Sequence, residues 1–475
     1  MPSVVADHDR SGRPRPAERL AAFVALAALP AALTILLVGA VMNWAALVAA
    51  VVALLVGVTA GWHAVSRRGT RRAVAGLGTV LALALLVAVV LAELSLPRLA
   101  VVLVLAALST AAARVALRRH GRSVAAAGRP AAKPAHPVLL MNPKSGGGKV
   151  ERFGLADACR RRGVEAVLLK PGEDLRELAE QALARGADAI GMAGGDGSQA
   201  IVAEVTARHN IPYVVVPTGT RNHLALDLGL DRDDVVGALD AFVDAVERRI
   251  DLATLNGRVF VNNASLGLYA HVVQSPQYRD AKLKTAAETL PDLLGPDAVG
   301  PDLRFTGPDG APHSTAQLIL VSNGPYQLDR LEGRGTRERM DSGRLGVVTL
   351  TIRDAAEALQ FTTLQAAGQV RRFPGWLQWT AERFEVRSGG PVAVGVDGEA
   401  LTVEPPIVFA TLPGALRLRL PRHTVGLSPA GRAVHLFSRS TVADLAAVCL
   451  GRPAERHRQA GATRWKPAWL DKGSR

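Results

Sequence analysis

Residues 189–198 read AIGMAGGDGS, an apolar run followed by two glycines, an acid, a glycine and a serine. The run Ala189–Ala193 is short and continuous, which is typical of a strand buried on both faces of a parallel sheet. The glycines that follow form a loop at the carboxyl end of this strand and lead into a helical pattern. Open α/β sheets bind their ligands at that edge. The stretch therefore predicts an α/β domain with a binding loop.

Two other apolar runs end in glycine-bearing loops. Residues 138–141 lead into Asn142-Pro143-Lys144-Ser145-Gly146, and residues 213–216 lead into Pro217-Thr218-Gly219-Thr220-Arg221-Asn222. A further strand is expected at 166–169, and helical patterns separate the runs. One glycine-rich loop is weak support because glycine also serves ordinary turns, but three at one sheet edge indicate a binding site. We expect the nucleotide-binding α/β domain over 137–248.

These loops have the composition of a phosphate site. Backbone N–H groups can point into an open concavity, and glycine permits the close approach. Ser145–Gly148 lies at a helix start, Lys144 adds positive charge, and the pattern is not a Walker A loop. Thr218 and Thr220 offer hydroxyl groups, although a role as plain turn residues stays equally open. Asp196 either forms a turn or faces the phosphates and holds Mg²⁺ directly or through water.

From about residue 248 the pattern changes to short strands separated by turn signals. Strand candidates lie at 259–262, 303–306, 316–321, 345–352, 384–387, 392–396 and 407–411. Helical patterns near 277–290 and 354–369 interrupt them. We expect a mostly antiparallel β-sandwich domain over 249–421.

Four apolar stretches precede both domains, at 21–41, 42–62, 73–91 and 99–117. Because about 20 helical residues cross a hydrocarbon core, we expect four transmembrane helices within 20–119. They follow a tail over 1–19 and precede a linker over 120–136. A cleaved signal peptide is disfavoured, since three more spans follow the first. No charge lies at mid-span, which favours a passive anchor over a transporter.

The charges sit mainly at the two ends of the chain. Residues 1–136 carry 15 basic and 4 acidic side chains, and the basic C-terminal tail over 422–475 carries 10 and 3. The mildly acidic middle argues against nucleic acid as a partner. Arginine clusters near 10–19, 67–72 and 118–122 alternate with neutral loops, so we expect a multi-pass protein of the cell (inner) membrane with both termini and the two domains after the helices cytoplasmic. Two cysteines cannot form a disulfide framework. A last helix is expected near 442–449.

The order and spacing of the three loops strongly resemble the diacylglycerol kinase catalytic-domain family, which includes bacterial diacylglycerol kinases and sphingosine kinases. The resemblance runs from about 137 to 421 and takes in Asn263-Ala264-Ser265-Leu266-Gly267, Ser322-Asn323-Gly324 and Val396-Asp397-Gly398-Glu399. It implies a two-domain lipid kinase fold, with ATP held between the α/β domain and the β-sandwich.

The resemblance also implies site residues. Glu399 matches the general base of the family, although a plain hairpin turn with exposed acids is the alternative interpretation of its motif. Asp196 is expected to be catalytic and to bind Mg²⁺. The expected ATP-binding residues are Asn142, Pro143, Lys144, Ser145, Gly146, Gly194, Gly195, Asp196, Gly197, Ser198, Thr218, Gly219, Thr220 and Asn222.

The chain departs from the family pattern at Lys170, Ala200, His223 and Ser342, the last within a segment that helps to hold a structural Mg²⁺. The leading hypothesis is an ATP-dependent lipid kinase that phosphorylates a hydroxyl of a membrane lipid, either diacylglycerol or a related lipid such as a sphingoid base. The alternative is a catalytically lapsed, membrane-bound nucleotide- or lipid-binding protein. The lipid, the nucleotide preference and the oligomeric state stay open.

Overall fold

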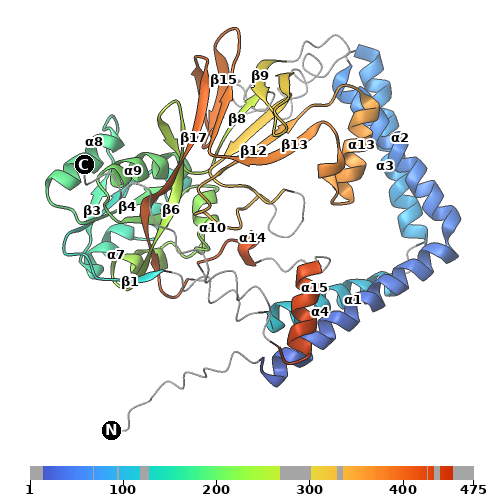
Figure 1. The fold of residues 1–475 in the computed structure, drawn as a ribbon, viewed down its shortest axis with the longest axis horizontal. Coiled ribbons are helices and arrows are strands. Elements are labelled where there is room, and N and C mark those ends of the chain that lie inside the picture. Colours follow the sequence, from blue (N-terminus) through green and yellow to red (C-terminus); the bar gives the residue numbers. More distant parts are fainter. Residues whose placement is uncertain are drawn as a thin grey trace. The chain divides into compact units, whose positions relative to one another are not determined.

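The computed structural model describes residues 14–67, 69–93, 96–117, 128–267, 301–328, 335–424, 426–432 and 439–452 (Figure 1). The chain divides into two compact units. The first comprises residues 1–50, 87–125 and 433–475, and the second comprises residues 51–86 and 126–432.

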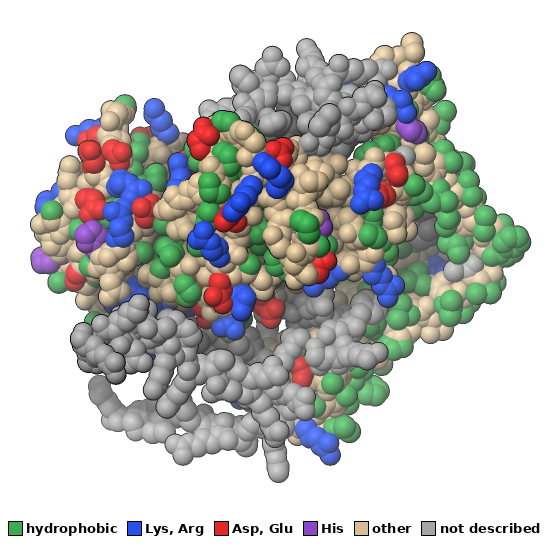
Figure 2. Space-filling model, turned by 45° about the horizontal axis from the view of Figure 1, so that its top comes forward, with side chains coloured by type: hydrophobic (Ala, Val, Ile, Leu, Met, Phe, Trp, Pro, Cys, Tyr) green, Lys and Arg blue, Asp and Glu red, His purple; other side chains and the backbone are tan. Residues whose placement is uncertain are grey.

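The four predicted apolar helices are present. They are α1 Pro16–Met42, α2 Trp44–Ser66, α3 Gly69–Glu93 and α4 Leu96–Ala116, and each is long and apolar enough to cross a membrane. Pro30 lies inside α1, which continues through it. Figure 2 shows hydrophobic side chains covering the long helices, and acidic and basic side chains mixed over the strand-rich part. The exposed apolar surface of these helices indicates that the protein associates with a membrane.

In the first unit, small residues allow close packing of α1 against α4. The hydroxyl of Ser109 on α4 donates a hydrogen bond to the carbonyl of Ala25 on α1, at 2.8 Å. The C-terminal helix α15, Arg439–Cys449, adds Leu445 and Val448 to the same apolar cluster, and it confirms the helix expected near 442–449. The cluster also contains Ala22, Ala25, Ala112, Ala113, Ala116 and Leu117.

The second unit contains the predicted parallel strands. They are β2 Pro137–Met141, β3 Glu165–Leu168, β4 Ala189–Gly194 and β5 Tyr213–Pro217, in the order β5-β4-β2-β3. The helices between them are α6 Lys149–Arg152, α7 Leu155–Arg162, α8 Leu175–Ala184 and α9 Asp196–Arg208. Strands β2, β4 and β5 are buried throughout, and their side chains belong to two apolar clusters. Burial on both faces of the sheet explains why their sequences are continuously apolar, as expected.

The sheet continues beyond the parallel strands to nine strands in all. Strand β17, Ile407–Pro421, pairs in parallel with β5 and antiparallel with β6, Ala245–Leu255. Strands β1 Arg129–Ala131 and β7 Arg258–Phe260 pair with β6, and β14 Arg383–Val386 pairs with β17. Since the sheet includes residues outside 137–248, the domain boundaries stay a proposal.

The second sheet has six strands, and all its pairings are antiparallel, as expected. In order these are β13 Trp376–Ala381, β12 Leu345–Leu350, β11 Leu318–Ser322, β8 Asn263–Gly267, β15 Val392–Val396 and β16 Glu399–Val403. One apolar cluster combines side chains of this sheet with those of β6, β7, β14 and β17. The predicted sandwich itself stays a proposal.

Short elements complete the second unit. A separate hairpin joins β9 Asp302–Thr306 to β10 Pro312–Thr315. The helical pattern at 354–369 corresponds to α13 Ala355–Ala366, whereas the pattern at 277–290 lies outside the described residues. The remaining elements are α10 His223–Asp227, α14 Pro429–Arg432 and the 3-10 helices Ser145–Gly147, Gly237–Phe242 and Val370–Arg372.

Candidate active site

The structure brings the three predicted loops into contact at the carboxyl edge of the parallel strands. Gly146 has a φ of 56°, and a Cβ built there would lie 2.0 Å from the carbonyl oxygen of Thr218. The amide of Gly219 donates to the carbonyl of Gly194 at 3.2 Å. Glycine is therefore needed at 146 both for its backbone conformation and for the close approach of the loops.

The loop after β2 has an open face. Gly147 and Gly148 have positive φ, and a Cβ built at either would meet no atom within 4 Å. Lys144 is exposed and Ser145 is half-buried beside them. Consecutive backbone N–H groups near an open space are the arrangement that binds phosphate groups in other proteins.

Two of the predicted nucleotide-binding residues lie inside their loop. Thr218 is fully buried, and Asn222 is 4% exposed. The amide of Asn222 donates to the carbonyls of Pro217 and Gly219, at 3.2 and 2.8 Å, so its side chain fixes the shape of the loop. Thr220, by contrast, is exposed at the same edge.

Asp196 begins helix α9 and also holds the start of α10. Its carboxylate accepts hydrogen bonds from the amides of His223 and Leu224, each at 3.1 Å. An ionised carboxylate has about four lone-pair positions, so these two bonds leave capacity for another ligand. Asp196 is thus a cap on α10, as the turn interpretation allows, and it still has acceptor sites for water or a metal ion.

Glu399 lies beside the first turn of α9, in the other domain. It follows a two-residue hairpin turn between β15 and β16, in which Asp397 and Gly398 have φ values of 47° and 91°. A Cβ built at Gly197 would lie only 2.8 Å from Oε1 of Glu399. The hairpin therefore places Glu399 next to the residue that follows Asp196.

Arg258, at the start of β7, contacts Glu399, and sequence analysis did not identify it as a site residue. Its Nη2 donates to Oε2 of Glu399 at 2.7 Å, and both side chains are about half exposed. The pair contributes little stability at such exposure, but it orients Oε1 toward Gly197. No motif contains Arg258, and 141 positions separate the two residues.

Asp397 anchors the hairpin that carries Glu399. Its buried carboxylate accepts hydrogen bonds from the amides of Val261, Asn262 and Asn263, at 2.8 to 3.2 Å. Burial raises the pKa of Asp397 to about 7, and these amide donors oppose the shift. The acid-glycine-acid motif at 397–399 is thus joined to the motif at 263–267, because the carboxylate of Asp397 accepts a hydrogen bond from the amide of Asn263.

Gln199 is a second residue that sequence reasoning missed. Its buried amide donates to the carbonyls of Met192, Gly194 and Val216, which belong to the ends of β4 and β5. The hydroxyl of Tyr213 donates to Oε1 of the same side chain. Gln199 therefore clamps the strand ends from which two of the loops depart.

Arg337 and Asp227 form a fully buried ion pair between α10 and the β domain. The backbone amide and Nε of Arg337 each donate to the carboxylate at 2.8 Å. Nη1 donates to the carbonyls of Val261 and Asn323, and Nη2 donates to Asn262 Oδ1. Burial disfavours the charge, but the Asp227 carboxylate raises the pKa of Arg337 above its usual value.

The four departures from the family pattern have distinct surroundings. Lys170 is exposed after β3, and Ala200 packs in the core of the α/β domain. His223 presents its amide to Asp196. The hydroxyl of Ser342 donates to the carbonyl of Arg344 at 3.4 Å.

The acidic side chains around Ser342 already have ion-pair or hydrogen-bond partners. Asp341 pairs with Arg339, and the neighbouring Asp251 accepts hydrogen bonds from the amides of Gly343 and Gly414. Burial raises the pKa of Asp251. Over the described residues, no group of three or more His, Cys, Asp or Glu side chains could hold a metal ion.

The chain is similar to several known proteins. Residues 136–255 match the diacylglycerol kinase catalytic domain. The chain is 31% identical over 302 residues to a Pseudomonas aeruginosa protein named probable lipid kinase YegS-like, covering 60% of this chain and 94% of that protein. It is 26% identical over 232 residues to the diacylglycerol kinase of Bacillus subtilis, covering 48% of this chain and 76% of that one. A crystal structure of a diacylglycerol kinase from Bacillus anthracis aligns with a TM-score of 0.44 and 16% identity, covering 62% of this chain and all of that one.

The matched domain and the relative covered over almost its whole length define a class of enzyme, the lipid kinases. The chain belongs to the diacylglycerol kinase family, and it carries four apolar helices ahead of the catalytic region.

Proposed function

We propose that this lipid kinase transfers the γ-phosphate of ATP to a hydroxyl of a membrane lipid, either diacylglycerol or a related lipid such as a sphingoid base. The position of Glu399 beside Gly197 carries the proposal, because it brings a candidate base next to a candidate phosphate-binding loop. The family relationship supports the reaction class, and the apolar helices fit a substrate that stays in the bilayer.

In this mechanism the loops after β2 and β4 bind the ATP phosphates through their amides, and Lys144 adds positive charge. The lipid hydroxyl oxygen attacks the γ-phosphorus while the bond from that phosphorus to the β,γ-bridging oxygen breaks. Glu399 takes the hydroxyl proton, and ADP leaves. Arg258 keeps Oε2 engaged, so Oε1 is the oxygen positioned to accept the proton.

The residues present fit Mg²⁺ bound mainly by phosphate. Mg²⁺ usually takes one or two carboxylates together with phosphate oxygens and water. Asp196 has free lone pairs at the loop edge, and the described residues contain no larger group of metal ligands there. Mg²⁺ would supply neutralisation of charge on the transferred phosphoryl group, and Asp196 would hold it directly or through water.

We further propose that the four apolar helices cross the cell (inner) membrane, with the catalytic region and both termini in the cytoplasm. ATP is a cytoplasmic substrate, and the arginine-rich segments support this orientation. The anchor would keep the catalytic region close to a lipid that rarely leaves the bilayer.

One experiment tests the reaction. Detergent-solubilised protein is incubated with labelled ATP, Mg²⁺ and a membrane lipid extract, and the labelled product is identified by mass spectrometry. A phosphorylated lipid supports the proposal. ATP binding without any labelled lipid would contradict it and favour the lapsed binding protein, which the exchanges at Ala200, His223 and Ser342 motivate.

A further inference from the structure

Helices α2 and α3 approach each other through small residues. A Cβ built at Gly57 would lie 3.4 Å from Cβ of Ala82, and one built at Gly78 would lie 3.5 Å from Cβ of Ala60. A Cβ at Gly61 would lie 3.7 Å from the methyl of Thr79. Small side chains at such spacing permit close helix packing in a membrane. The two helices therefore form a hairpin with its own contact surface.

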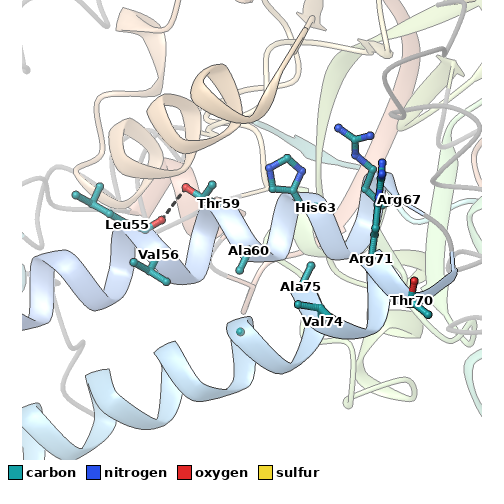
Figure 3. A pocket seen from close by; sticks show the side chains of 11 residues that line it. Leu55, Val56, Thr59, Ala60, His63, Arg67, Thr70, Arg71, Val74 and Ala75 are labelled. Carbon is teal, nitrogen blue, oxygen red and sulfur yellow. Dashed lines mark hydrogen bonds between the residues drawn. The ribbon is translucent and has the colours of Figure 1, made fainter.

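A groove of about 820 Å³ runs between these helices toward the turn that joins them (Figure 3). Away from the turn its lining is mostly apolar, and it includes Leu55, Val56 and Val74, which are 40%, 52% and 72% exposed. The hydroxyl of Thr59 already donates to the carbonyl of Leu55, so it adds no free donor to this part. Apolar surface of this kind on helices of membrane-spanning length requires lipid chains to cover it.

The end of the groove near the turn is basic. His63 comes from α2, Arg67 directly follows the last residue of that helix, and Arg71 comes from α3. Figure 3 shows the side chains of Arg67 and Arg71 pointing the same way at this end, with His63 one helical turn further along α2. The guanidinium groups of Arg67 and Arg71 thus both lie at the end of the groove where the apolar lining stops.

The hairpin supplies no counter-charge for these groups. No acidic residue occurs between Glu18 and Glu93. Within the described ranges, no carboxylate forms an ion pair with Arg67 or Arg71. Paired guanidinium groups at the edge of a bilayer attract an anion, and lipid phosphate is the anion present at that depth.

We propose that this groove binds one anionic phospholipid of the surrounding bilayer. Its phosphate accepts hydrogen bonds from Arg67 and Arg71, whose planar forks match phosphate oxygens, and an acyl chain covers Leu55, Val56 and Val74. The site rests on the proposed membrane crossing and is separate from the candidate active site. A peptide partner would leave the apolar middle facing hydrocarbon, so a molecule with one charged end and one apolar end fits both parts.

The test uses the full chain, purified in a neutral detergent and stripped of lipid. Native mass spectrometry measures the binding of phosphatidylglycerol and of phosphatidylcholine with the same acyl chains. We expect phosphatidylglycerol to bind wild type about tenfold more tightly, and the double variant Arg67→Gln/Arg71→Gln to lose that preference. Arg98→Gln, which removes an arginine from α4, is the matched control and should keep it. Equal preference in the double variant and wild type would overturn the proposal.

Two further measurements separate the parts of the site. Ala75→Leu fills the apolar lining while leaving both arginines in place, so it should weaken binding of both lipids. Unchanged binding in this variant would show that only the headgroup is held, against the proposal. Phosphatidic acid should displace phosphatidylglycerol, because it presents a phosphate to the same two arginines. Failure to displace it would show that the groove does not recognise the lipid phosphate, against the proposal.

A kinase assay with a short-chain lipid in micelles keeps this inference distinct from the proposed function. Arg67→Gln/Arg71→Gln should turn over like wild type, because neither arginine belongs to the candidate active site. Loss of turnover in the double variant would contradict the separation of the two sites. Absence of turnover in wild type would contradict the kinase proposal but leave the lipid-binding result in force.

Discussion

Glu399 shows what a short motif can and cannot predict about a single residue. The family resemblance of its motif predicted a general base at this position, and a plain hairpin turn with exposed acids was the competing interpretation. The turn is real, yet its two acids differ completely. Asp397 is buried against three amides, whereas Glu399 is half exposed beside Gly197. Only the three-dimensional structure distinguishes the buried acid that anchors the turn from the half-exposed acid beside the candidate phosphate loop.

We expect Glu399→Gln to lower kcat by roughly 10²- to 10⁴-fold while ATP affinity changes little. Glutamine keeps the shape and can still bond Arg258, but it cannot accept a proton. Steady-state turnover and ATP calorimetry measure the two effects. Glu382→Gln, at an exposed acid that pairs with Arg344, is the matched control. An unchanged kcat in Glu399→Gln would remove this residue from the mechanism.

Asp196 caps α10, and in the proposed mechanism it also holds Mg²⁺; substitution can separate the two roles. Asp196→Ala removes both acceptors that cap α10, and we expect a loss of about 0.5–2 kcal/mol in the free energy of unfolding. Asp196→Asn keeps one acceptor, so it should lose less stability. Turnover should disappear in both variants, because both lack the negative charge. Thermal unfolding and turnover are measured together. Near-normal turnover in Asp196→Asn would show that the residue acts only as a cap.

Asp397 should make stability depend on pH. Its pKa is about 7 in the folded chain against 3.8 for an ordinary aspartate. Between about pH 4 and 7 the unfolded chain has released this proton and the folded chain retains it, so the free energy of unfolding falls as pH rises. Asp397→Asn should lose this component of the slope, as followed by unfolding midpoints across that range. Asp309→Asn, in an exposed turn, should keep it. Parallel slopes in Asp397→Asn and wild type would contradict the assignment.

At the scale of elements, α10 is a five-residue helix held at both ends. Asp196 binds its first amides, and Asp227 at its end pairs with Arg337 of the β domain. Such a short helix has little stability of its own, so these contacts determine its position. Through them the loop after β5 is connected to the segment 261–263, which also holds Asp397.

Breaking this buried pair from one side should be costly. We expect Arg337→Met or Asp227→Leu to lower the free energy of unfolding by about 3–5 kcal/mol, because each leaves a buried charge without its partner. The double variant should lose clearly less than the sum of the two. Denaturant unfolding of the four proteins in one double-mutant cycle measures the coupling. Additive effects would show that the pair contributes no specific interaction.

The strands around the site were predictable to different extents. The structure confirms all four predicted parallel strands, but only β2, β4 and β5 are buried throughout. The strand expected to be buried at 166–169 is β3, an edge strand whose residues are exposed or half-buried. The expected strand at 407–411 extends in fact to Pro421 as β17. Pro413 and Gly414 look like the end of a strand, but a register shift between Leu412 and Leu416 accommodates them. Beyond that shift Leu416, Leu418 and Leu420 are buried. Leucine at every second position was therefore a sequence signal that the strand continues.

For the whole molecule, local sequence patterns predicted the individual helices, strands and loops. They did not predict contacts between residues that are distant in sequence. Glycine loops, apolar runs and turn signals depend on neighbouring residues, and they located the helices, the strands and the candidate site. The contacts of Arg258 with Glu399 and of Arg337 with Asp227 join residues 141 and 110 positions apart. No single-sequence pattern marks such pairs, because each partner alone resembles an ordinary surface charge.

The sequence also predicts how the whole chain is oriented across the membrane. Arginines cluster before α1, between α2 and α3 and after α4, while the turn at Asn43 carries no charge. Moving such clusters across the bilayer is disfavoured, so we expect Asn43 outside and the catalytic region inside. After Cys159 and Cys449 are replaced by serine, single cysteines are introduced as Asn43→Cys and Lys133→Cys. A membrane-impermeant maleimide should label Asn43→Cys in intact cells and Lys133→Cys only after permeabilisation. The reverse pattern would place the catalytic region on the side without ATP, and it would count against both the orientation and the kinase reaction proposed here.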